Sequence, residues 1–287
     1  MKSTIIKGTL IPIGGNEDKG ANEFQGVDFI EQGILSHVVN QAGGNESKIV
    51  VIPTASSIPD EVGEMYLEAF KLLDCSNVTI LDIREPEQSN SKETIDLVKN
   101  CDCVMFSGGD QSRITDIIGG SKLHELLAYK YKNESFVIAG TSAGAMAMAT
   151  EMIAGGSVTD SLFKGAVLMS KGLGLLPQFI IDTHFVKRGR FGRMAEAVAT
   201  YTDLIGIGLA EDTGIIINRG HFEVIGSGMV ILFDPSKLTH NKHETLEEGT
   251  PMSMSNLITH ILARGDQFRF EDRSIEISTS FKPSLQS

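Results

Sequence analysis

The chain has 287 residues, of which 41% are hydrophobic and 22% are charged, and its formal net charge is −12. This composition is that of an ordinary globular protein, long enough for one large α/β domain or two small ones. The negative charge argues against nucleic acid or an anionic membrane surface as a main partner. No linker or repeat divides the sequence, so we expect a single domain over residues 1–287.

The three cysteines, Cys75, Cys101 and Cys103, form no CxxC pair. Two of them alternate along an expected strand, which is typical of buried thiols rather than of ligands or disulfide partners. The early apolar run at residues 5–6 is too short for a signal peptide, and no segment is long and apolar enough to span a bilayer. We therefore expect a cytoplasmic protein. The histidines and cysteines show no zinc spacing, so we expect no metal.

The first half of the chain alternates short apolar runs with helical patterns. Strands are expected at 9–13, 48–53, 78–81, 101–106 and 136–139. Helices are expected at 27–39, where the apolar residues share one helix face, and at 59–73, which begins with Pro59 and Asp60. Apolar strands separated by helices predict an α/β fold with a mostly parallel sheet and helices on both faces.

The second half is less regular. Residues 155–177 are rich in Gly and Ser and predict a long loop, whereas 179–182 and 204–210 predict strands and 191–201 a helix. Several short strands are expected within 206–230, where they would pair antiparallel at the sheet edge. Residues 237–249 are polar and predict a surface loop.

The most informative motif is Gly140-Thr141-Ser142-Ala143-Gly144, directly after an apolar strand. A serine on a sharp strand-to-helix turn exposes its hydroxyl at the sheet edge. The small neighbours leave room for a substrate carbonyl, and the N–H groups of the next helix would face a developing oxyanion. The motif therefore predicts Ser142 as a nucleophile with the Ala143 N–H as an oxyanion donor. The alternative is that small residues only allow close packing of a helix on a strand.

A catalytic serine needs a general base and an acid that orients it. His184 lies just after the strand at 179–182, and functional sites in α/β sheets gather where strands end, so it is the first candidate for the base. The alternative is a histidine with a structural role, bonded to a backbone carbonyl. His221 is the second candidate, although Arg219-Gly220-His221 is typical of a hairpin turn.

Two carboxylates could orient that histidine. Asp182 lies two residues earlier, on the same side of a strand, and Glu211 follows the apolar run 204–210. Spacing does not choose between them. If Glu211 is the acid, the order Ser-His-acid differs from the order in α/β-hydrolases and disfavours that family.

Two further motifs predict substrate contacts. Ser107-Gly108-Gly109-Asp110-Gln111 follows a strand, and its glycines would let a second oxyanion N–H approach closely. A basic cluster follows His184, and arginine forks bind carboxylates, so a substrate with carboxylates near the scissile bond is indicated. The alternative is a solvated helix face paired with Glu196. The cluster comprises Lys187, Arg188, Arg190 and Arg193.

Together these motifs resemble the serine peptidase family that contains cyanophycinase and the aspartyl dipeptidases. The resemblance also uses Gly14-Gly15-Asn16-Glu17-Asp18-Lys19, Asp182-Thr183-His184-Phe185 and Gly208-Leu209-Ala210-Glu211, and extends from about residue 8 to residue 266. The opening motif and the chain length favour the cyanophycinase branch over the shorter aspartyl dipeptidases.

The resemblance implies Ser142 as nucleophile, His184 as base and Glu211 as orienting acid, with oxyanion N–H groups from Gly109 and Ala143. It implies a fold like that of class I glutamine amidotransferases (a flavodoxin-like sandwich), a homodimer and no cofactor. Those amidotransferases carry cysteine at the elbow, so Ser142 argues against their chemistry. The resemblance also places seven residues around the substrate, namely Asp110, Gln111, Asp182, Thr183, Arg188, Arg190 and Arg193.

The implied substrate is cyanophycin, a poly-aspartate backbone with arginine on each β-carboxyl, which the branch cuts to β-Asp-Arg dipeptides. Thr183 stands where the branch usually has glutamine, and a threonine lacks the amide for that contact. Alternatives are a dipeptidase or isoaspartyl peptidase acting on small Asp-containing peptides, or a non-catalytic binding member of the fold.

Overall fold

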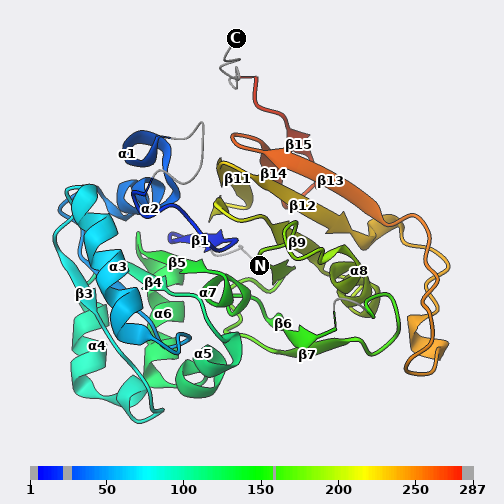
Figure 1. Ribbon diagram of the computed structural model, residues 1–287, viewed down its shortest axis with the longest axis horizontal. Helices are drawn as coiled ribbons and strands as arrows, with labels where there is room; N and C mark the ends of the chain where they lie inside the picture. The colour runs from blue at the N-terminus through cyan, green and yellow to red at the C-terminus, as the bar shows by residue number, and fades with distance from the viewer. Residues whose placement is uncertain (1–5, 22–27, 158–159, 280–287) are drawn as a thin grey trace.

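The computed structural model describes residues 6–21, 28–157 and 160–279. These residues form an α/β structure with a nine-stranded, a four-stranded and a two-stranded sheet (Figure 1). In this part of the chain, no helix is long and apolar enough to cross a membrane.

One part of the nine-stranded sheet is parallel. Its strands lie in the order β3 (Val78–Ile80), β2 (Ile49–Ile52), β4 (Cys103–Phe106), β5 (Val137–Thr141) and β1 (Thr9–Ile13), and each pairs parallel with its neighbour. Every residue of β2, β4 and β5 is buried, because helices cover both faces, and this accounts for their unbroken apolar sequences. The predicted parallel core is confirmed.

The rest of this sheet is antiparallel, so the expectation of a mostly parallel sheet needs correction. β10 (Thr213–Asn218) pairs antiparallel with β1, and β11 (His221–Gly226), β14 (Gln267–Arg269) and β15 (Ile275–Glu276) follow outward. β10 and β11 form the predicted hairpin, with Arg219 and Gly220 at positive φ in its turn. The β10–β11 and β14–β15 connections are too short for a parallel crossover, so these two pairs are antiparallel.

The four-stranded sheet has the order β13 (Ile258–Ala263), β12 (Met229–Asp234), β9 (Ile205–Leu209) and β8 (Phe179–Asp182). The strands expected within 206–230 are therefore shared between two sheets. β8 and β9 are parallel, so their carboxyl ends meet at one edge. Buried residues of both strands belong to the same apolar cluster as those of β4 and β5, so the two sheets share a core.

Helices cover both faces of the parallel strands, as expected. Ile34, Tyr66 and Phe70 pack on one face, from α2 (Ile34–Ala42) and α3 (Pro59–Leu72). The other face is covered by α4 (Lys92–Lys99), α5 (Gln111–Ile118) and α6 (Lys122–Asn133). The 3-10 turn η1 (Gln88–Asn90) precedes α4, and α8 (Phe191–Thr200) packs against β9.

Two predicted segments differ from the structure. The helix expected at 27–39 is divided into α1 (Phe29–Gln32) and α2 at Gly33, where a Cβ would lie 2.5 Å from the Phe29 carbonyl oxygen; Val27 lies outside the described residues. The loop expected at 155–177 contains a hairpin of β6 (Glu151–Gly156) and β7 (Val167–Lys171). Both strands are partly exposed, and β6 ends in Ala154-Gly155-Gly156, so their apolar pattern is weak.

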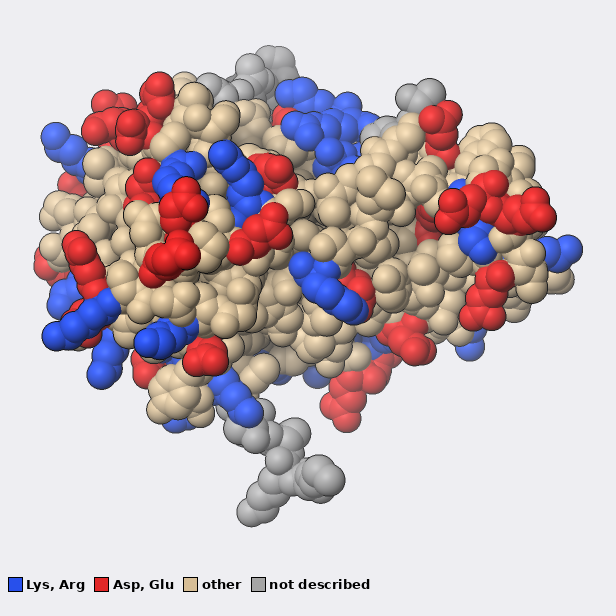
Figure 2. Space-filling model, turned by 90° about the horizontal axis from the view of Figure 1, so that it is seen from below, with Lys and Arg blue, Asp and Glu red and all other residues tan. Residues whose placement is uncertain are grey.

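The polar segment 237–249 is largely exposed, as predicted, and includes η3 (His243–Thr245), with η2 (Pro235–Lys237) directly before it. On the face shown in Figure 2, acidic and basic side chains are interspersed. That face therefore has the mixed surface of an ordinary globular protein rather than a continuous basic stripe.

Candidate active site

Ser142 occupies a strained turn at the end of β5. Gly140 and Thr141 still pair with β1, so the strand runs two residues further than the sequence predicts. Ser142 then has φ 51° and ψ −109°, and α7 (Ala143–Met146) follows. The flanking glycines are required sterically, since a Cβ at position 140 would lie 2.7 Å from backbone atoms of Gly144. This is the strand-to-helix turn that the motif predicts.

A continuous chain of hydrogen bonds joins Ser142, His184 and Glu211. His184 follows β8, and its Nε2 lies 3.1 Å from Ser142 Oγ. Its Nδ1 lies 2.7 Å from Glu211 Oε1, and Glu211 follows β9. Two sheets thus contribute to one site, which we call the Ser-His-Glu chain. Of the two carboxylates that the sequence leaves open, Glu211 is the one bonded to the histidine.

The charge states of these groups suit general base chemistry. Burial lowers the pKa of His184, and the nearby Arg188 and Arg190 lower it further, while the Glu211 hydrogen bond only partly opposes this. Burial raises the pKa of Glu211, but the hydrogen bonds from Lys187 and His184 outweigh it, so this pKa lies below its ordinary value. At neutral pH the neutral imidazole therefore donates from Nδ1 to ionised Glu211 and accepts the Ser142 hydroxyl proton at Nε2.

The Gly108-Gly109 turn lies beside the serine, as the motif predicts. A Cβ on Gly108 would lie 3.4 Å from Ser142 Cβ. Gly109 has φ +143°, and a Cβ there would lie 2.0 Å from the Ala55 carbonyl oxygen. Only glycine fits this position, since both its φ and the close backbone exclude a side chain. The turn therefore brings backbone close to the hydroxyl, where an oxyanion would form.

The two polar residues after this turn have structural contacts. Asp110 accepts a hydrogen bond from Ser112 N at 2.9 Å and caps α5. Gln111 Nε2 donates to the carbonyl oxygens of Ile153 at 2.9 Å and Ala154 at 3.0 Å, and so ties α5 to β6. Asp110 remains exposed and Gln111 is half-buried.

Asp182 and Thr183 face the protein interior, and both are 0% exposed. The Asp182 carboxylate accepts hydrogen bonds from Arg190 and Arg193. Thr183 Oγ1 lies 3.4 Å from Met146 Sδ. Two of the four basic residues after His184 thus neutralise a buried carboxylate, because an unpaired charge there would be costly.

The other basic residues of this run differ in their partners. Lys187 Nζ lies 2.9 Å from Glu211 Oε2, a contact that sequence reasoning missed. Arg188 is exposed, and no ion pair of its guanidinium is found among the described residues. Glu196, the alternative partner of this cluster, instead accepts from Gly165 N at 2.8 Å. His221 lies in the β10–β11 hairpin, at the far end of β10 from Glu211.

Comparison with known proteins decides the family. The model of peptidase family S51 matches residues 23–225. The chain belongs to peptidase family S51. It is therefore a serine peptidase by family, which confirms the resemblance seen in the sequence.

This S51 peptidase is similar to several cyanophycinases. It is 36% identical to that of Trichormus variabilis over 94% of this chain and 88% of the relative. It is 33% identical to that of Geminocystis herdmanii over 92% and 94% of the two chains. A crystal structure of a peptidase from an acI-B1 Actinobacterium matches with a TM-score of 0.63 at 19% identity, over 93% of this chain and 98% of that one, and so supports the fold.

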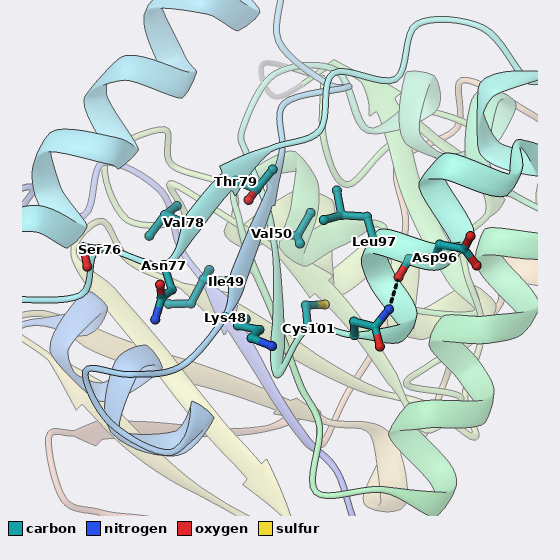
Figure 3. Close-up of a pocket in the computed structure, with 11 residues that line it drawn as sticks. Lys48, Ile49, Val50, Ser76, Asn77, Val78, Thr79, Asp96, Leu97 and Cys101 are labelled. Carbon is teal, nitrogen blue, oxygen red and sulfur yellow. Dashed lines mark hydrogen bonds between the residues drawn. The ribbon is translucent and has the colours of Figure 1, made fainter.

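A separate pocket of the S51 peptidase lies at the opposite edge of the sheet (Figure 3). It occupies about 480 Å³ between the first residues of β2 and β3 and the end of α4. The Cys101 thiol lines it, and burial raises the pKa of that thiol to about 12. Asn100 donates to the Asp96 carbonyl oxygen at 2.7 Å within this wall. A protonated thiol is a poor nucleophile, so this pocket lacks the reactivity of the Ser-His-Glu chain.

Proposed function

We propose that this S51 peptidase hydrolyses cyanophycin, releasing β-Asp-Arg dipeptides, with Ser142 as its nucleophile. The observation that carries the proposal is the hydrogen-bonded order Ser142 Oγ, His184 Nε2, His184 Nδ1 and Glu211 Oε1. Elements from two sheets supply these groups in the geometry that acyl transfer to serine requires.

In the proposed reaction, His184 Nε2 takes the hydroxyl proton as Ser142 Oγ attacks the carbonyl carbon of an aspartyl peptide bond. The tetrahedral oxyanion accepts hydrogen bonds from the Ala143 and Gly109 N–H groups. His184 then gives its proton to the leaving amine, and the carbon–nitrogen bond breaks. A water molecule, deprotonated by His184, attacks the acyl-enzyme and releases the acid product together with free Ser142. Glu211 holds the imidazole in its productive tautomer throughout.

The arginine run after His184 supports recognition of aspartate carboxylates, with different tasks for its members. Arg188 is exposed and close enough to His184 to lower its pKa, so it is the member we assign to a substrate carboxylate. Arg190 and Arg193 hold Asp182 and would shape the site from behind. Asp110 is exposed and would meet an arginine side chain of the substrate.

A second candidate is a peptidase for small aspartyl or isoaspartyl peptides, and Thr183 favours it. The threonine is buried against Met146, so it offers the substrate no side-chain contact in place of the branch's glutamine. A shorter substrate needs fewer such contacts.

We also propose that the chain is a single domain with the class I glutamine amidotransferase-like sandwich, acting as a cytoplasmic homodimer. The strand order β3-β2-β4-β5-β1 with helices on both faces supports the sandwich. The apolar cluster common to the two larger sheets supports the single domain.

The test is mass spectrometry of the purified protein incubated with cyanophycin, with Ser142→Ala as the control. Release of β-Asp-Arg by the wild type alone is expected, and Ser142→Ala should lose several orders of magnitude in kcat. If folded wild type releases no dipeptide but cleaves short Asp-X or isoaspartyl peptides, the second candidate replaces the first. A Ser142→Ala variant with wild-type turnover would overturn the nucleophile assignment.

A further inference from the structure

The turn after β1, Gly14-Gly15-Asn16-Glu17-Asp18, contacts the segments that carry the proposed catalytic groups. Its sequence carried the family resemblance, yet none of its side chains enters the proposed reaction. Two features single it out: a buried carboxylate at Glu17 and a set of backbone hydrogen bonds to the three catalytic segments.

Glu17 is only 4% exposed, and each of its carboxylate oxygens has a defined partner. Oε2 accepts from Thr141 Oγ1 at 2.5 Å, and Thr141 is the residue directly before the nucleophile. Oε1 accepts from Tyr66 Oη at 2.6 Å and from Lys19 Nζ at 2.9 Å. Burial opposes the charge of Glu17, but Lys19 and these hydrogen bonds outweigh it, so its pKa lies below the ordinary value.

The backbone around Glu17 binds all three catalytic segments. The Ser142 N–H donates to the Ile13 carbonyl at 2.9 Å, and the His184 N–H donates to the Gly14 carbonyl at 2.8 Å. Asp212, the neighbour of Glu211, donates its N–H to the Gly15 carbonyl at 3.0 Å. The last residue of β1 and the first two residues of the turn therefore bind the chain at the nucleophile, at the base and beside the acid.

The turn also contacts the catalytic histidine ring directly. A Cβ built on Gly15 would lie 2.4 Å from His184 Nε2, so the glycine backbone forms a wall against the imidazole. Asp18 completes the link to the acid segment, since its N–H donates to Asp212 Oδ1 at 3.1 Å.

Several residues at these contacts have strained backbone conformations. Non-glycine residues with positive φ include Asn16 (51°), Ser142 (51°), His184 (46°) and Asp212 (45°). Such conformations cost on the order of 1–3 kcal/mol each and persist only where surrounding contacts hold them. Backbone hydrogen bonds from the end of β1 and from this turn hold the last three of these four residues.

We propose that Glu17 is a positioning residue that anchors this turn and thereby sets the distance between Ser142 Oγ and His184 Nε2. The expected effect on kcat rests on the proposed function, whereas the anchoring of the turn by Glu17 does not. Without the Glu17–Thr141 bond, the last residue of β5 loses its side-chain tether, and the strained serine turn relaxes. Small displacements of a nucleophile are expensive, since about 1 Å can cost on the order of 10²-fold in rate.

The test uses a matched pair of variants at Thr141 and one variant at Glu17. Thr141→Val removes the hydroxyl at constant shape, whereas Thr141→Ser keeps it. Glu17→Gln keeps the size but loses the charge and one acceptor. We expect Glu17→Gln and Thr141→Val to lower kcat by roughly 10- to 100-fold with little change in KM, and Thr141→Ser to stay near wild type. The double variant should be no slower than the slower single, because both changes break one link.

Lys130→Met is the control for stability alone. Lys130 is buried, and its Nζ donates to the Lys99 and Cys101 carbonyl oxygens near the amino ends of the parallel strands, away from Ser142. It should lower the melting temperature and leave kcat unchanged. If Lys130→Met lowers kcat as much as Glu17→Gln does at a similar loss of melting temperature, the loss of stability explains the effect. That result would overturn the positioning role.

A readout independent of substrate separates this inference from the proposed function. Proton NMR of the His184 Nδ1–H···Glu211 hydrogen bond, with the titration of His184, should change in Glu17→Gln but not in Lys130→Met. Unchanged signals in Glu17→Gln would overturn the inference whatever the enzyme cleaves. Changed signals in a protein that cleaves no aspartyl peptide would support the positioning role and reject the proposed function.

Discussion

Asp182 and Arg193 form a buried two-point ion pair. Arg193 Nε donates to Asp182 Oδ2 at 2.8 Å and Nη2 to Oδ1 at 2.5 Å, and the two residues are 0% and 4% exposed. Arg190 Nη1 adds a third hydrogen bond to the same carboxylate at 2.8 Å. The pair thus stabilises the end of β8, two residues before His184, and neither partner is available as a free charge for substrate.

We expect Arg193→Ala to destabilise the fold by about 3–5 kcal/mol, since it leaves a buried carboxylate short of a partner. Urea unfolding measures this loss. Arg188→Ala is the control, because Arg188 is exposed and should change stability by less than about 0.5 kcal/mol. Equal stabilities of the two variants would contradict the structural role of the pair.

Glu211→Gln and Asp182→Asn should affect different properties. The first leaves His184 Nδ1 without its anionic acceptor, so we expect kcat to fall by about 10³–10⁴-fold with the fold intact. The second weakens the pair with Arg193, so we expect mainly a loss of stability. Steady-state kinetics beside thermal unfolding distinguishes them. A larger kcat loss in Asp182→Asn would reassign the orienting acid.

The pH dependence of kcat/KM should report His184. Only the neutral imidazole accepts the serine proton, and its pKa lies below the ordinary 6.5, so activity should fall on acidification only beneath that value. Arg188 lowers this pKa, and Arg188→Ala should therefore move the acid limb to higher pH, whereas Arg188→Lys, which keeps the charge, should not. An unmoved limb in Arg188→Ala would show that its charge does not reach the imidazole.

Gly15→Ala should impair catalysis through a steric effect on His184. The new Cβ would lie 2.4 Å from Nε2, so the ring must shift away from Ser142, and we expect kcat to fall by on the order of 10²-fold. Gly44→Ala is a matched control, because Gly44 has φ +98° against +97° at Gly15 but has nothing within 4 Å of its Cβ position. Similar activity losses in both variants would assign the effect to backbone strain alone.

The native protein should resist thiol reagents at neutral pH. Cys75, Cys101 and Cys103 are free and buried, and burial raises all three thiol pKa values, that of Cys101 to about 12. Thiol titration with and without denaturant checks this, with three reactive groups expected only after unfolding. A fast-reacting thiol in the folded protein would contradict the buried placement.

The sequence predicts the parallel core well because its signals are local. Continuous apolar runs such as Ile49–Ile52 can be satisfied only in a strand that is covered on both faces. The β6–β7 hairpin is missed because both strands are partly exposed and β6 ends in two glycines, so neither the spacing of apolar residues nor strand propensity identifies them. The assignment of β9 and β12 to a second sheet depends on long-range pairing that no local pattern encodes.

Local patterns identify the serine turn and the strand ends that carry His184 and Glu211, because glycine spacing and apolar runs are properties of neighbouring residues. The choice of the carboxylate that bonds to the histidine depends instead on how distant strands pair. Parallel pairing of β8 with β9 brings residues 184 and 211 to one edge, and the left-handed backbone of His184 breaks the alternation that would have kept it beside Asp182. The buried Asp182 carboxylate requires cationic partners, and so it binds Arg190 and Arg193, which the family resemblance places around the substrate.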